Sequence, residues 1–299
     1  MKTLYTLGLA LVLTPLPGLV QAQASAEPEI ASYSIDTTLK ISTDRKTRGV
    51  SDTHGEPGLE LTVEAAHESG LIAQLQLGSV SRVNYPEGNN LNAMLALGWR
   101  GGNPEGWHYG LGAAREWFPG ARVDEAPAGF DVSFTPTGWV NTRFHTSYLV
   151  AELGWSYLTA RYLYVVSRDF RGANTATVCG NYLLVKLPSG DLGPALDCYG
   201  SAMQHSRGTQ LLDLDLSYPL NGQTKLVAHL GWQRVRNFRG LDTMDYRLGL
   251  EHQRWGLVWG AELAGASVRN RDLFIAIDTD GTMRQMEKPK LILTVAKKF

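Results

Sequence analysis

Two short stretches place a histidine close to a serine, the pair of side chains from which hydrolases build an activated nucleophile. They are His67-Glu68-Ser69 and His205-Ser206. This chemistry also needs an orienting acid, and all the groups must converge on one point. The first stretch lies in a predicted tight turn, where serine is an ordinary turn residue, and the second has no evident acidic partner. We therefore rank a hydrolase third among the candidate functions and expect no catalytic residues.

Metal-binding and phosphate-binding patterns are not evident in the sequence. Gly110-Leu111-Gly112 lies inside an alternating segment and not at a strand-to-helix turn, so it does not predict a phosphate-binding loop. The remaining histidines do not have the spacing of metal ligands. We therefore expect neither a metal nor a cofactor. These scattered histidines are His54, His108, His145, His229 and His252.

The charged residues alternate with apolar ones in many short segments. In 59–65, for example, Glu60 and Glu64 occupy even positions, and the odd positions are all apolar. Successive strand residues point to opposite faces, so each such segment is a strand with one apolar and one polar face. Strands of about ten residues with this alternation predict a transmembrane antiparallel up-and-down β-barrel. The alternation recurs in 71–77, 91–100, 212–218 and 244–251.

The connections between these segments alternate between short and long. Short periplasmic turns and long extracellular loops are typical of outer-membrane barrels. A soluble β-sandwich or lipocalin-like barrel also has one apolar face, but it seldom repeats hairpins over a chain this long. The pattern is weakest over 128–145, where Phe130 to Thr135 is compatible with a separate strand. The predicted strands are 31–44, 58–67, 71–80, 91–100, 107–118, 145–154, 157–167, 208–218, 223–236, 243–253, 256–268 and 289–299.

Both ends of the chain fit export to the outer membrane. Lys2 and the apolar run to Val20 predict a signal peptide over 1–22, with cleavage after Ala22 or Ala24. A membrane anchor is the weaker interpretation, because the run is short and contains two prolines. The signal leaves 23–299 as a single barrel domain. The last strand ends on Phe299, and a terminal aromatic residue resembles the recognition signal of the barrel-assembly machinery.

The two cysteines, Cys179 and Cys198, both fall in the longest predicted connection, 168–207. An exported chain passes through the oxidising periplasm. We therefore predict a disulfide, which would stabilise a loop of about 20 residues by roughly 3 kcal/mol in the chain-entropy model. A catalytic thiol is disfavoured, because no histidine or aspartate stands at a suggestive spacing nearby.

The polar faces of the predicted strands should point into the barrel lumen. Acids outnumber bases there, so a pore would mildly prefer cations. Alternatively, the charges pair across the lumen and stabilise a plugged barrel. The predicted lumen acids are Glu60, Glu64, Glu116, Glu152, Asp213, Asp215, Asp245, Glu251 and Glu262, and the predicted bases are Arg100, Arg161, Lys225 and Arg247.

Three motifs near the N-terminus resemble the TorF-type porin family. They are Thr47-Arg48-Gly49-Val50-Ser51, Pro57-Gly58-Leu59-Glu60-Leu61 and His67-Glu68-Ser69-Gly70-Leu71. The resemblance implies an outer-membrane location and a channel role, and it supplies no catalytic residues. The regular succession of hairpins fits this family over most of the mature chain. The long connections 119–144 and 168–207 depart from the compact family pattern.

The first functional hypothesis is a passive channel in the outer membrane, with lipid, small solutes and the barrel-assembly machinery as partners. The 28 basic and 29 acidic residues nearly balance, which argues against a nucleic-acid partner. The second hypothesis is a plugged structural barrel that binds a partner through its outer loops. Aromatic anchors for such binding would be Phe130, Phe134, Trp139, Phe170 and Tyr182.

Overall fold

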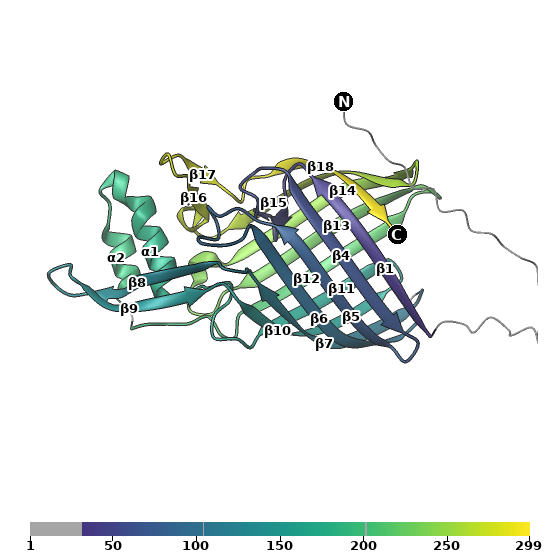
Figure 1. Ribbon diagram of the computed structural model, residues 1–299, viewed down its shortest axis with the longest axis horizontal. Helices are drawn as coiled ribbons and strands as arrows, with labels where there is room; N and C mark the ends of the chain where they lie inside the picture. Colours follow the sequence, from purple (N-terminus) through teal and green to yellow (C-terminus); the bar gives the residue numbers. More distant parts are fainter. Residues whose placement is uncertain (1–31, 104, 201) are drawn as a thin grey trace, which may run out of the picture. The chain divides into compact units, whose positions relative to one another are not determined.

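A computed structural model describes residues 32–103, 105–200 and 202–299. Twelve antiparallel strands close into a barrel in the order β1-β18-β15-β14-β13-β12-β11-β10-β7-β6-β5-β4 (Figure 1). The predicted signal peptide lies outside the described residues. The barrel strands are β1 (Tyr33–Ser42), β4 (Gly58–His67), β5 (Leu71–Ser79), β6 (Leu91–Gly102), β7 (Trp107–Trp117), β10 (Thr146–Trp155), β11 (Leu158–Val165), β12 (Gln210–Pro219), β13 (Thr224–Arg234), β14 (Thr243–Arg254), β15 (Leu257–Val268) and β18 (Lys290–Lys298).

The alternation of apolar and polar residues determines which face of each strand points outward. On β6, Leu95, Leu97 and Trp99 are exposed large apolar side chains, whereas Asn92 is buried inside. A closed barrel leaves no unpaired strand edge, and an apolar exterior suits lipid, so this is the architecture of a transmembrane barrel. The prediction of twelve strands in an all-β barrel is confirmed, and every strand end agrees within about two residues, inside the error of sequence-based boundaries.

The two ends of the barrel differ in their connections. Turns of two to four residues join the strands at the end where β1 begins and β18 finishes. Trp107, Trp155 and Trp255 are exposed at this end, as in the aromatic girdles of membrane barrels. We assign this end to the periplasm. The opposite end carries loop 1 (43–57), loop 2 (80–90), loop 3 (118–145), loop 4 (166–209), loop 5 (235–242) and loop 6 (269–289).

The longer outer loops contain secondary structure of their own. Loop 3 forms a hairpin of β8 (Arg122–Phe130) and β9 (Pro136–Arg143), and loop 6 forms one of β16 (Ile275–Ile277) and β17 (Met283–Gln285). A separate strand over Phe130–Thr135 is therefore wrong, because β8 ends at Phe130 and a turn follows. Loop 4 holds α1 (Thr175–Lys186), the short 3-10 helix η1 (Leu187–Ser189) and α2 (Gly193–Tyr199). No helix within the described ranges is long and apolar enough to cross a membrane.

Loop 1 packs against the inner side of the barrel wall. Its two short strands, β2 (Lys46–Thr47) and β3 (Val50–Ser51), pair as a tight hairpin whose turn residues Arg48 and Gly49 both have positive φ. A Cβ atom on Gly49 would lie 2.3 Å from the carbonyl oxygen of Gly265 on β15. Only glycine can make so close an approach with φ of +70°. This packing brings loop 1 into the candidate site.

Candidate functional site in the barrel lumen

A cavity of about 520 Å³ lies inside the barrel and is lined by residues from the strands and from loops 1 and 4. The sequence predicts thirteen lumen residues, and eleven of them line this cavity: Glu60, Glu64, Arg100, Glu116, Glu152, Arg161, Asp213, Asp215, Asp245, Arg247 and Glu262. The two exceptions, Glu251 and Lys225, are not among the lining residues and pair with each other on neighbouring strands, at 2.9 Å.

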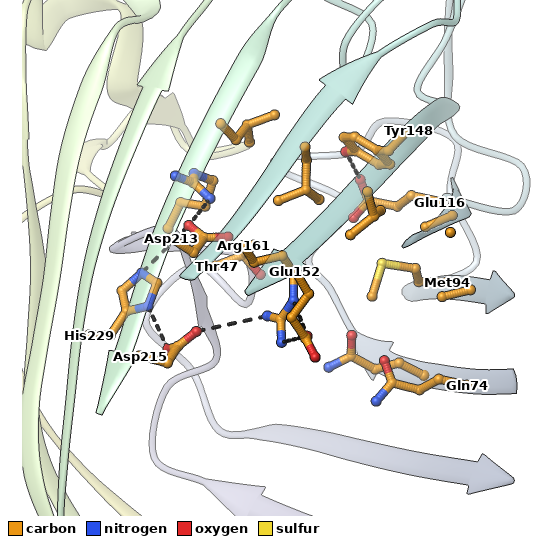
Figure 2. Close-up of a pocket in the computed structure, with 18 of the residues that line it drawn as sticks. Thr47, Gln74, Met94, Glu116, Tyr148, Glu152, Arg161, Asp213, Asp215 and His229 are labelled. Carbon is orange, nitrogen blue, oxygen red and sulfur yellow. Dashed lines mark hydrogen bonds and ion pairs between the residues drawn. The ribbon is translucent and has the colours of Figure 1, made fainter. Parts of the chain in front are cut away.

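Charges of opposite sign stand side by side around much of the lumen (Figure 2). Arg161 on β11 is directly opposite Glu152 on β10, with Nη2 and Oε2 2.9 Å apart. Arg100 on β6 approaches the other oxygen of Glu152 at 3.2 Å. We call this arrangement the charge belt. It consists of Arg100, Glu152, Arg161, Asp215, His229, Arg247 and Glu262.

The charge belt continues with longer separations beyond Arg161. The carboxylate of Asp215 lies 3.8 Å from Arg161 and 3.9 Å from Arg247, and Arg247 lies 3.7 Å from Glu262. These separations exceed hydrogen-bonding distance. Nε of Arg247 has no hydrogen-bond partner among the described residues although it is shielded from solvent. This part of the belt therefore keeps unused hydrogen-bonding capacity.

His229 links three aspartates on the wall formed by β12, β13 and β14. Its Nδ1 is 2.8 Å from Asp215, and its Nε2 is 2.9 Å from Asp245 and 4.0 Å from Asp213. The sequence analysis treated His229 as one of several scattered histidines. Strand register would have revealed the role of His229, because this residue stands opposite Asp215 and Arg247 on the inward face.

Loop 4 contributes a base that the strand pattern did not reveal. Arg171 donates two hydrogen bonds to Glu116, from Nε at 2.9 Å and from Nη2 at 2.6 Å, and Tyr148 donates a third at 3.0 Å. Such a bidentate pair is a strong, geometrically specific contact. It ties loop 4 to the inner wall of the barrel and neutralises one of the predicted lumen acids.

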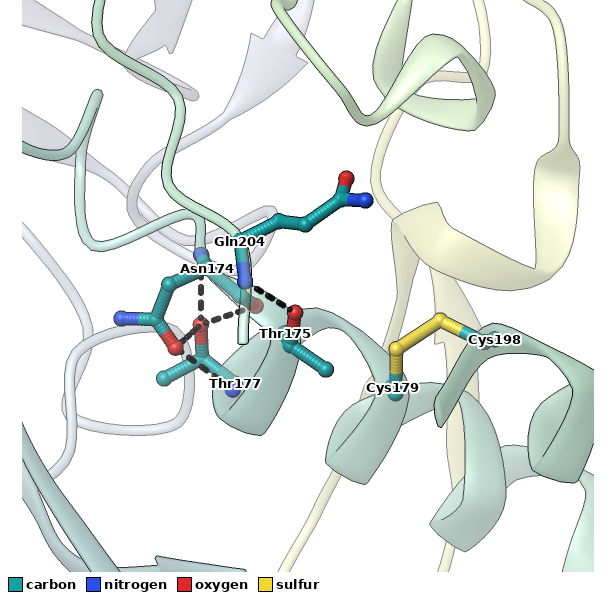
Figure 3. Close-up of a disulfide and its surroundings, with 6 residues drawn as sticks. All are labelled: Asn174, Thr175, Thr177, Cys179, Cys198 and Gln204. Carbon is teal, nitrogen blue, oxygen red and sulfur yellow. Dashed lines mark hydrogen bonds between the residues drawn. A yellow bond between two sulfur atoms is a disulfide. The ribbon is translucent and has the colours of Figure 1, made fainter. Parts of the chain in front are cut away.

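A disulfide and a helix cap fix the outer part of loop 4 (Figure 3). Cys179 on α1 is bonded to Cys198 on α2, as predicted. The side chain of Asn174 caps the start of α1 by accepting from the backbone N–H of Thr177 at 3.2 Å, and the hydroxyl of Thr175 accepts from Gln204 at 2.8 Å. The loop is therefore a folded cap over the barrel and not a loose connection.

The turn of loop 1 contacts the wall that carries His229. Nη1 of Arg48 donates to Asp213 at 2.6 Å, and Nη2 donates to the carbonyl oxygen of Trp232 at 3.0 Å. Nη2 also lies 3.5 Å from Asp245, whose side chain is only 1% exposed. Arg48 thus supplies positive charge to two buried aspartates that also contact His229.

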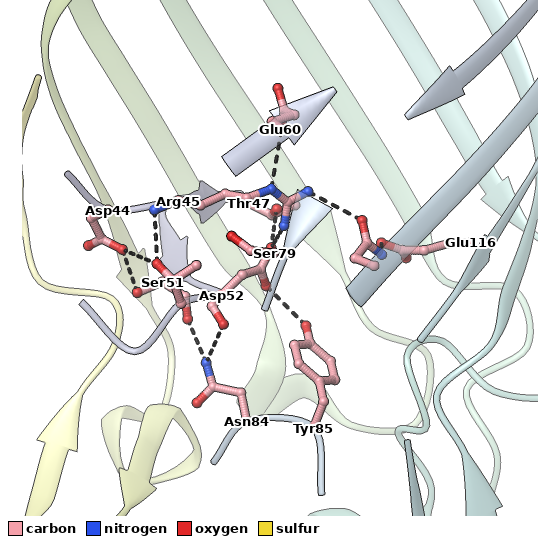
Figure 4. A network of polar contacts seen from close by, with 12 residues as sticks. Asp44, Arg45, Thr47, Ser51, Asp52, Glu60, Ser79, Asn84, Tyr85 and Glu116 are labelled. Atoms are coloured by element: carbon pink, nitrogen blue, oxygen red, sulfur yellow. Dashed lines mark hydrogen bonds and ion pairs between the residues drawn. The ribbon is translucent and has the colours of Figure 1, made fainter. Parts of the chain in front are cut away.

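A second arginine of loop 1 is the centre of a buried polar network (Figure 4). Arg45 donates to Asp52 at 2.7 Å, to Glu60 at 3.2 Å and to Asn92 at 3.2 Å. Tyr85 of loop 2 donates to Asp52 at 3.0 Å, and burial, followed by the charge of Asp52, holds the pKa of Tyr85 well above its usual value. Loops 1, 2 and 4 therefore meet at the outer end of the lumen.

The middle of the wall formed by β6 and β7 is smooth and apolar where it lines the cavity. Gly98 and Gly112 are register partners, and a Cβ on either would lie within 2.7 Å of a backbone carbonyl oxygen of the other strand. Ala96 and Ala114 are the next inward pair. The absence of side-chain bulk leaves room for the cavity, and all of the charge belt except Arg100 lies on other strands. The cavity therefore has one apolar side and one charged side.

Among the described residues, neither His–Ser stretch brings a nucleophile, a base and an orienting acid together. His67 Nδ1 lies 2.8 Å from Ser69 Oγ in the exposed turn between β4 and β5. His205 does have an acidic partner, Asp169 at 2.7 Å, contrary to the sequence analysis. However, Ser206 is fully buried and its hydroxyl donates to the carbonyl oxygen of Ala173 at 2.6 Å. Within the described residues, no group of three or more His, Cys, Asp or Glu side chains is arranged to hold a metal ion.

Comparison with known proteins assigns the chain to a family. A family model described as "Bacterial protein of unknown function (Gcw_chp)" matches residues 25–299, so the chain belongs to this family. No curated protein matches. This family model does not carry the TorF-type label, which stays a prediction.

Among solved structures, the chain is similar to the KdgM porin, with 7% identity and a TM-score of 0.42 over 89% of this chain and 97% of that one. It is also similar to the NanC porin, with 8% identity and a TM-score of 0.44 over 88% and 98%. These values are too low to inform the mechanism. The closed barrel, its apolar exterior and its aromatic girdle identify an outer-membrane β-barrel.

Proposed function

We propose that this Gcw_chp protein is a porin-like channel through which small solutes diffuse across the outer membrane. The observation that carries the proposal is the cavity of about 520 Å³ inside a closed barrel, lined by charged and polar side chains. A barrel that served only as a scaffold would have no need for so polar an unfilled interior. The TorF-type resemblance in the N-terminal motifs supports the same function.

In this proposal loop 1 narrows the outer part of the channel. Its hairpin is held on one side by Arg45 against Glu60 of β4, and on the other by Arg48 against Asp213 of β12. The Nζ of Lys46 adds hydrogen bonds to the carbonyl oxygens of Met286 and Lys288 in loop 6. Contacts on β4, β12 and loop 6 mean that the hairpin bridges separate parts of the wall, which is the geometry of a constriction.

The predicted preference for cations becomes weaker once the loops are included. The strands alone offer more acids than bases, but Arg45, Lys46, Arg48 and Arg171 enter the lumen from loops 1 and 4. We therefore propose a channel of mild cation preference at most. In bilayers under a salt gradient, Asp215→Asn should move the reversal potential toward anion selectivity by a few millivolts. An unchanged reversal potential would show that Asp215 does not contribute to ion selectivity.

A plugged barrel that binds partners through its outer loops is the second candidate. The hairpin of β8 and β9 projects from the barrel (Figure 1), and its side chains Phe134 and Trp139 are exposed. Two of the other predicted anchors are less available for binding, because Phe130 packs edge-on against Tyr199 and Phe170 is buried against Tyr148. The candidate therefore depends mainly on Phe134 and Trp139, with the half-buried Tyr182 of α1 as the remaining predicted anchor.

Two further roles are proposals about export and assembly. We propose that the barrel-assembly machinery recognises β18, whose terminal Phe299 is exposed and donates its backbone N–H to Thr37 at 2.9 Å. We also propose that 1–22 is removed as a signal peptide, with cleavage after Ala22 or Ala24, and that 23–299 is the mature barrel domain.

Single-channel recording of the refolded protein in a planar bilayer tests the proposed function. Discrete conductance steps are the expected result. A heat-modifiable, membrane-inserted protein that shows no steps would overturn the channel and favour the loop-mediated binder. Glu251→Gln is a matched control, because Glu251 does not line the cavity and the substitution should leave the unitary conductance unchanged.

A further inference from the structure

We propose that the lumen cavity selects small zwitterions that carry an apolar group, the chemical class of the apolar α-amino acids. The inference rests on the proposed channel function and specifies its solute. It follows from three features of the cavity: accessible charges of both signs, loose pairing between them, and an apolar wall on β6 and β7.

Charges of both signs in the belt are accessible to a solute. The side chains of Arg161 and Arg247 are each 38% exposed, and that of Asp215 between them is 33% exposed. By contrast, Arg45 and Arg48, which hold loop 1, are much more buried. The exposed trio therefore belongs to the solute-accessible surface, whereas the loop 1 arginines have a structural role.

The two ion pairs within this trio are long, although Arg161 also pairs with Glu152 at 2.9 Å and Asp215 with His229 at 2.8 Å. Asp215 stands 3.8 Å from Arg161 and 3.9 Å from Arg247, whereas the structural pairs of Arg45 and Arg48 are as short as 2.7 and 2.6 Å. Long, partly exposed ion pairs contribute little, so a solute can displace them at small cost. The Nε of Arg247 has no hydrogen-bond partner among the described residues but is shielded from solvent, so a solute contacts Arg247 through the exposed part of its side chain.

A zwitterion matches this surface better than an ion of either sign. Its carboxylate can accept from Arg161 or Arg247 while its ammonium group donates to Asp215. A simple anion would meet the carboxylates of Asp215 and Glu152 beside the arginines, and a simple cation would meet the arginines beside the acids. Like charges at such distances repel each other.

The apolar wall accommodates the rest of the solute. Ala96, Gly98, Gly112 and Ala114 present almost no side-chain bulk, and Val150 extends the surface onto β10. An aliphatic or aromatic group can lie against this wall while the charged end contacts the belt. A cavity of about 520 Å³ is within the range that small-molecule sites occupy.

The test uses four leucine derivatives that share one side chain and differ in charge. Leucine is zwitterionic at neutral pH, leucinamide is cationic, N-acetylleucine is anionic and N-acetylleucinamide is neutral. Efflux of each compound from proteoliposomes containing the full-length mature protein is followed by mass spectrometry, with protein-free liposomes as the blank. We expect leucine to leave roughly tenfold faster than the other three, which corresponds to about 1.4 kcal/mol of discrimination, and its rate to saturate.

A charge-neutral pair of substitutions identifies the site. The double variant Asp215→Asn with Arg247→Gln removes one charge of each sign, so it should abolish the leucine preference and leave the N-acetylleucinamide rate unchanged. Lys225→Gln with Glu251→Gln removes another pair of opposite charges that does not line the cavity, and the preference should persist. Heat-modifiable migration in gels confirms that both variants are folded.

The outcomes separate the two proposals. Equal rates for all four compounds would leave the channel standing and refute zwitterion selectivity. Faster efflux of N-acetylleucine than of leucine would also refute it, in favour of an anion-selective arginine surface. Efflux no faster than from protein-free liposomes for every compound would overturn the channel itself, and the inference with it.

Discussion

Replacing Arg48 with methionine should release loop 1 from the lumen. Methionine keeps much of the side-chain length but removes the hydrogen bonds to Asp213 and to the carbonyl oxygen of Trp232, and the ion pair with Asp245. Within 4 Å, the two aspartates would then keep only His229 as a basic partner. The substitution therefore acts on the anchor of the hairpin and changes none of the barrel strands.

The size of the effect follows from the burial of the three charged side chains. Arg48 and Asp213 are 13% and 12% exposed, and Asp245 is 1% exposed. Breaking a well-buried pair by removing one partner costs about 3–5 kcal/mol. Taking about 3 kcal/mol, the equilibrium between the seated and the released hairpin shifts by roughly 10²-fold. A released hairpin no longer narrows the lumen, so the channel should spend more time at a higher conductance.

Single-channel recordings of Arg48→Met and the parent protein give the measurement. The fraction of time spent in the higher-conductance state should rise strongly in the variant. Arg122→Met is the matched control, since Arg122 pairs with Asp124 on the outer hairpin, where both side chains are about half exposed and such pairs contribute little. If Arg48→Met inserts and folds normally but its conductance levels and occupancies equal those of the parent, the anchoring argument is wrong.

Three more predictions follow from the structure. Gly49→Val should release the same hairpin, because its Cβ would lie 2.3 Å from the carbonyl oxygen of Gly265, and recordings should resemble those of Arg48→Met; an unaltered trace would contradict the close packing. Replacing Cys179 and Cys198 together by serine should cost loop 4 about 3 kcal/mol and make it sensitive to protease, while heat-modifiable migration of the barrel stays the same; equal protease resistance would show that the disulfide is dispensable. Deleting Phe299 should lower the yield of outer-membrane protein in cells severalfold without impairing refolding in detergent, and an unchanged cellular yield would argue against recognition of the C-terminal residue.

The barrel could be predicted because the alternation that identifies each strand is contained within that strand. A strand in this barrel shows its inward and outward faces within ten residues, so segments such as 59–65 and 244–251 reveal both the strand and the residues that line the lumen. The disulfide was predictable for a similar reason, since an exported chain with two cysteines in one loop offers a single intramolecular pairing.

The contents of the lumen could not be predicted in full because they depend on contacts between distant parts of the chain. Arg48 and Asp213 are 165 residues apart, and the residues around Arg48 show no alternation of apolar and polar side chains. His229 has the correct inward parity, but its role depends on aspartates from two neighbouring strands. Helix α1 of loop 4 lacks a regular amphipathic spacing and is held by the Asn174 cap and the disulfide. Tertiary contacts therefore decide these features.

The inward course of loop 1 also has a consequence for the order of assembly. The hairpin is made early in synthesis, just after β1, yet its anchors lie on β12, β14, β15 and loop 6. One of its hydrogen bonds joins residues 242 positions apart. Contacts of such long sequence separation form late, after most of the chain has been ordered. Loop 1 can therefore be seated only once the C-terminal strands are in place, which makes insertion of the hairpin and closure of the β1–β18 seam the linked final events of folding.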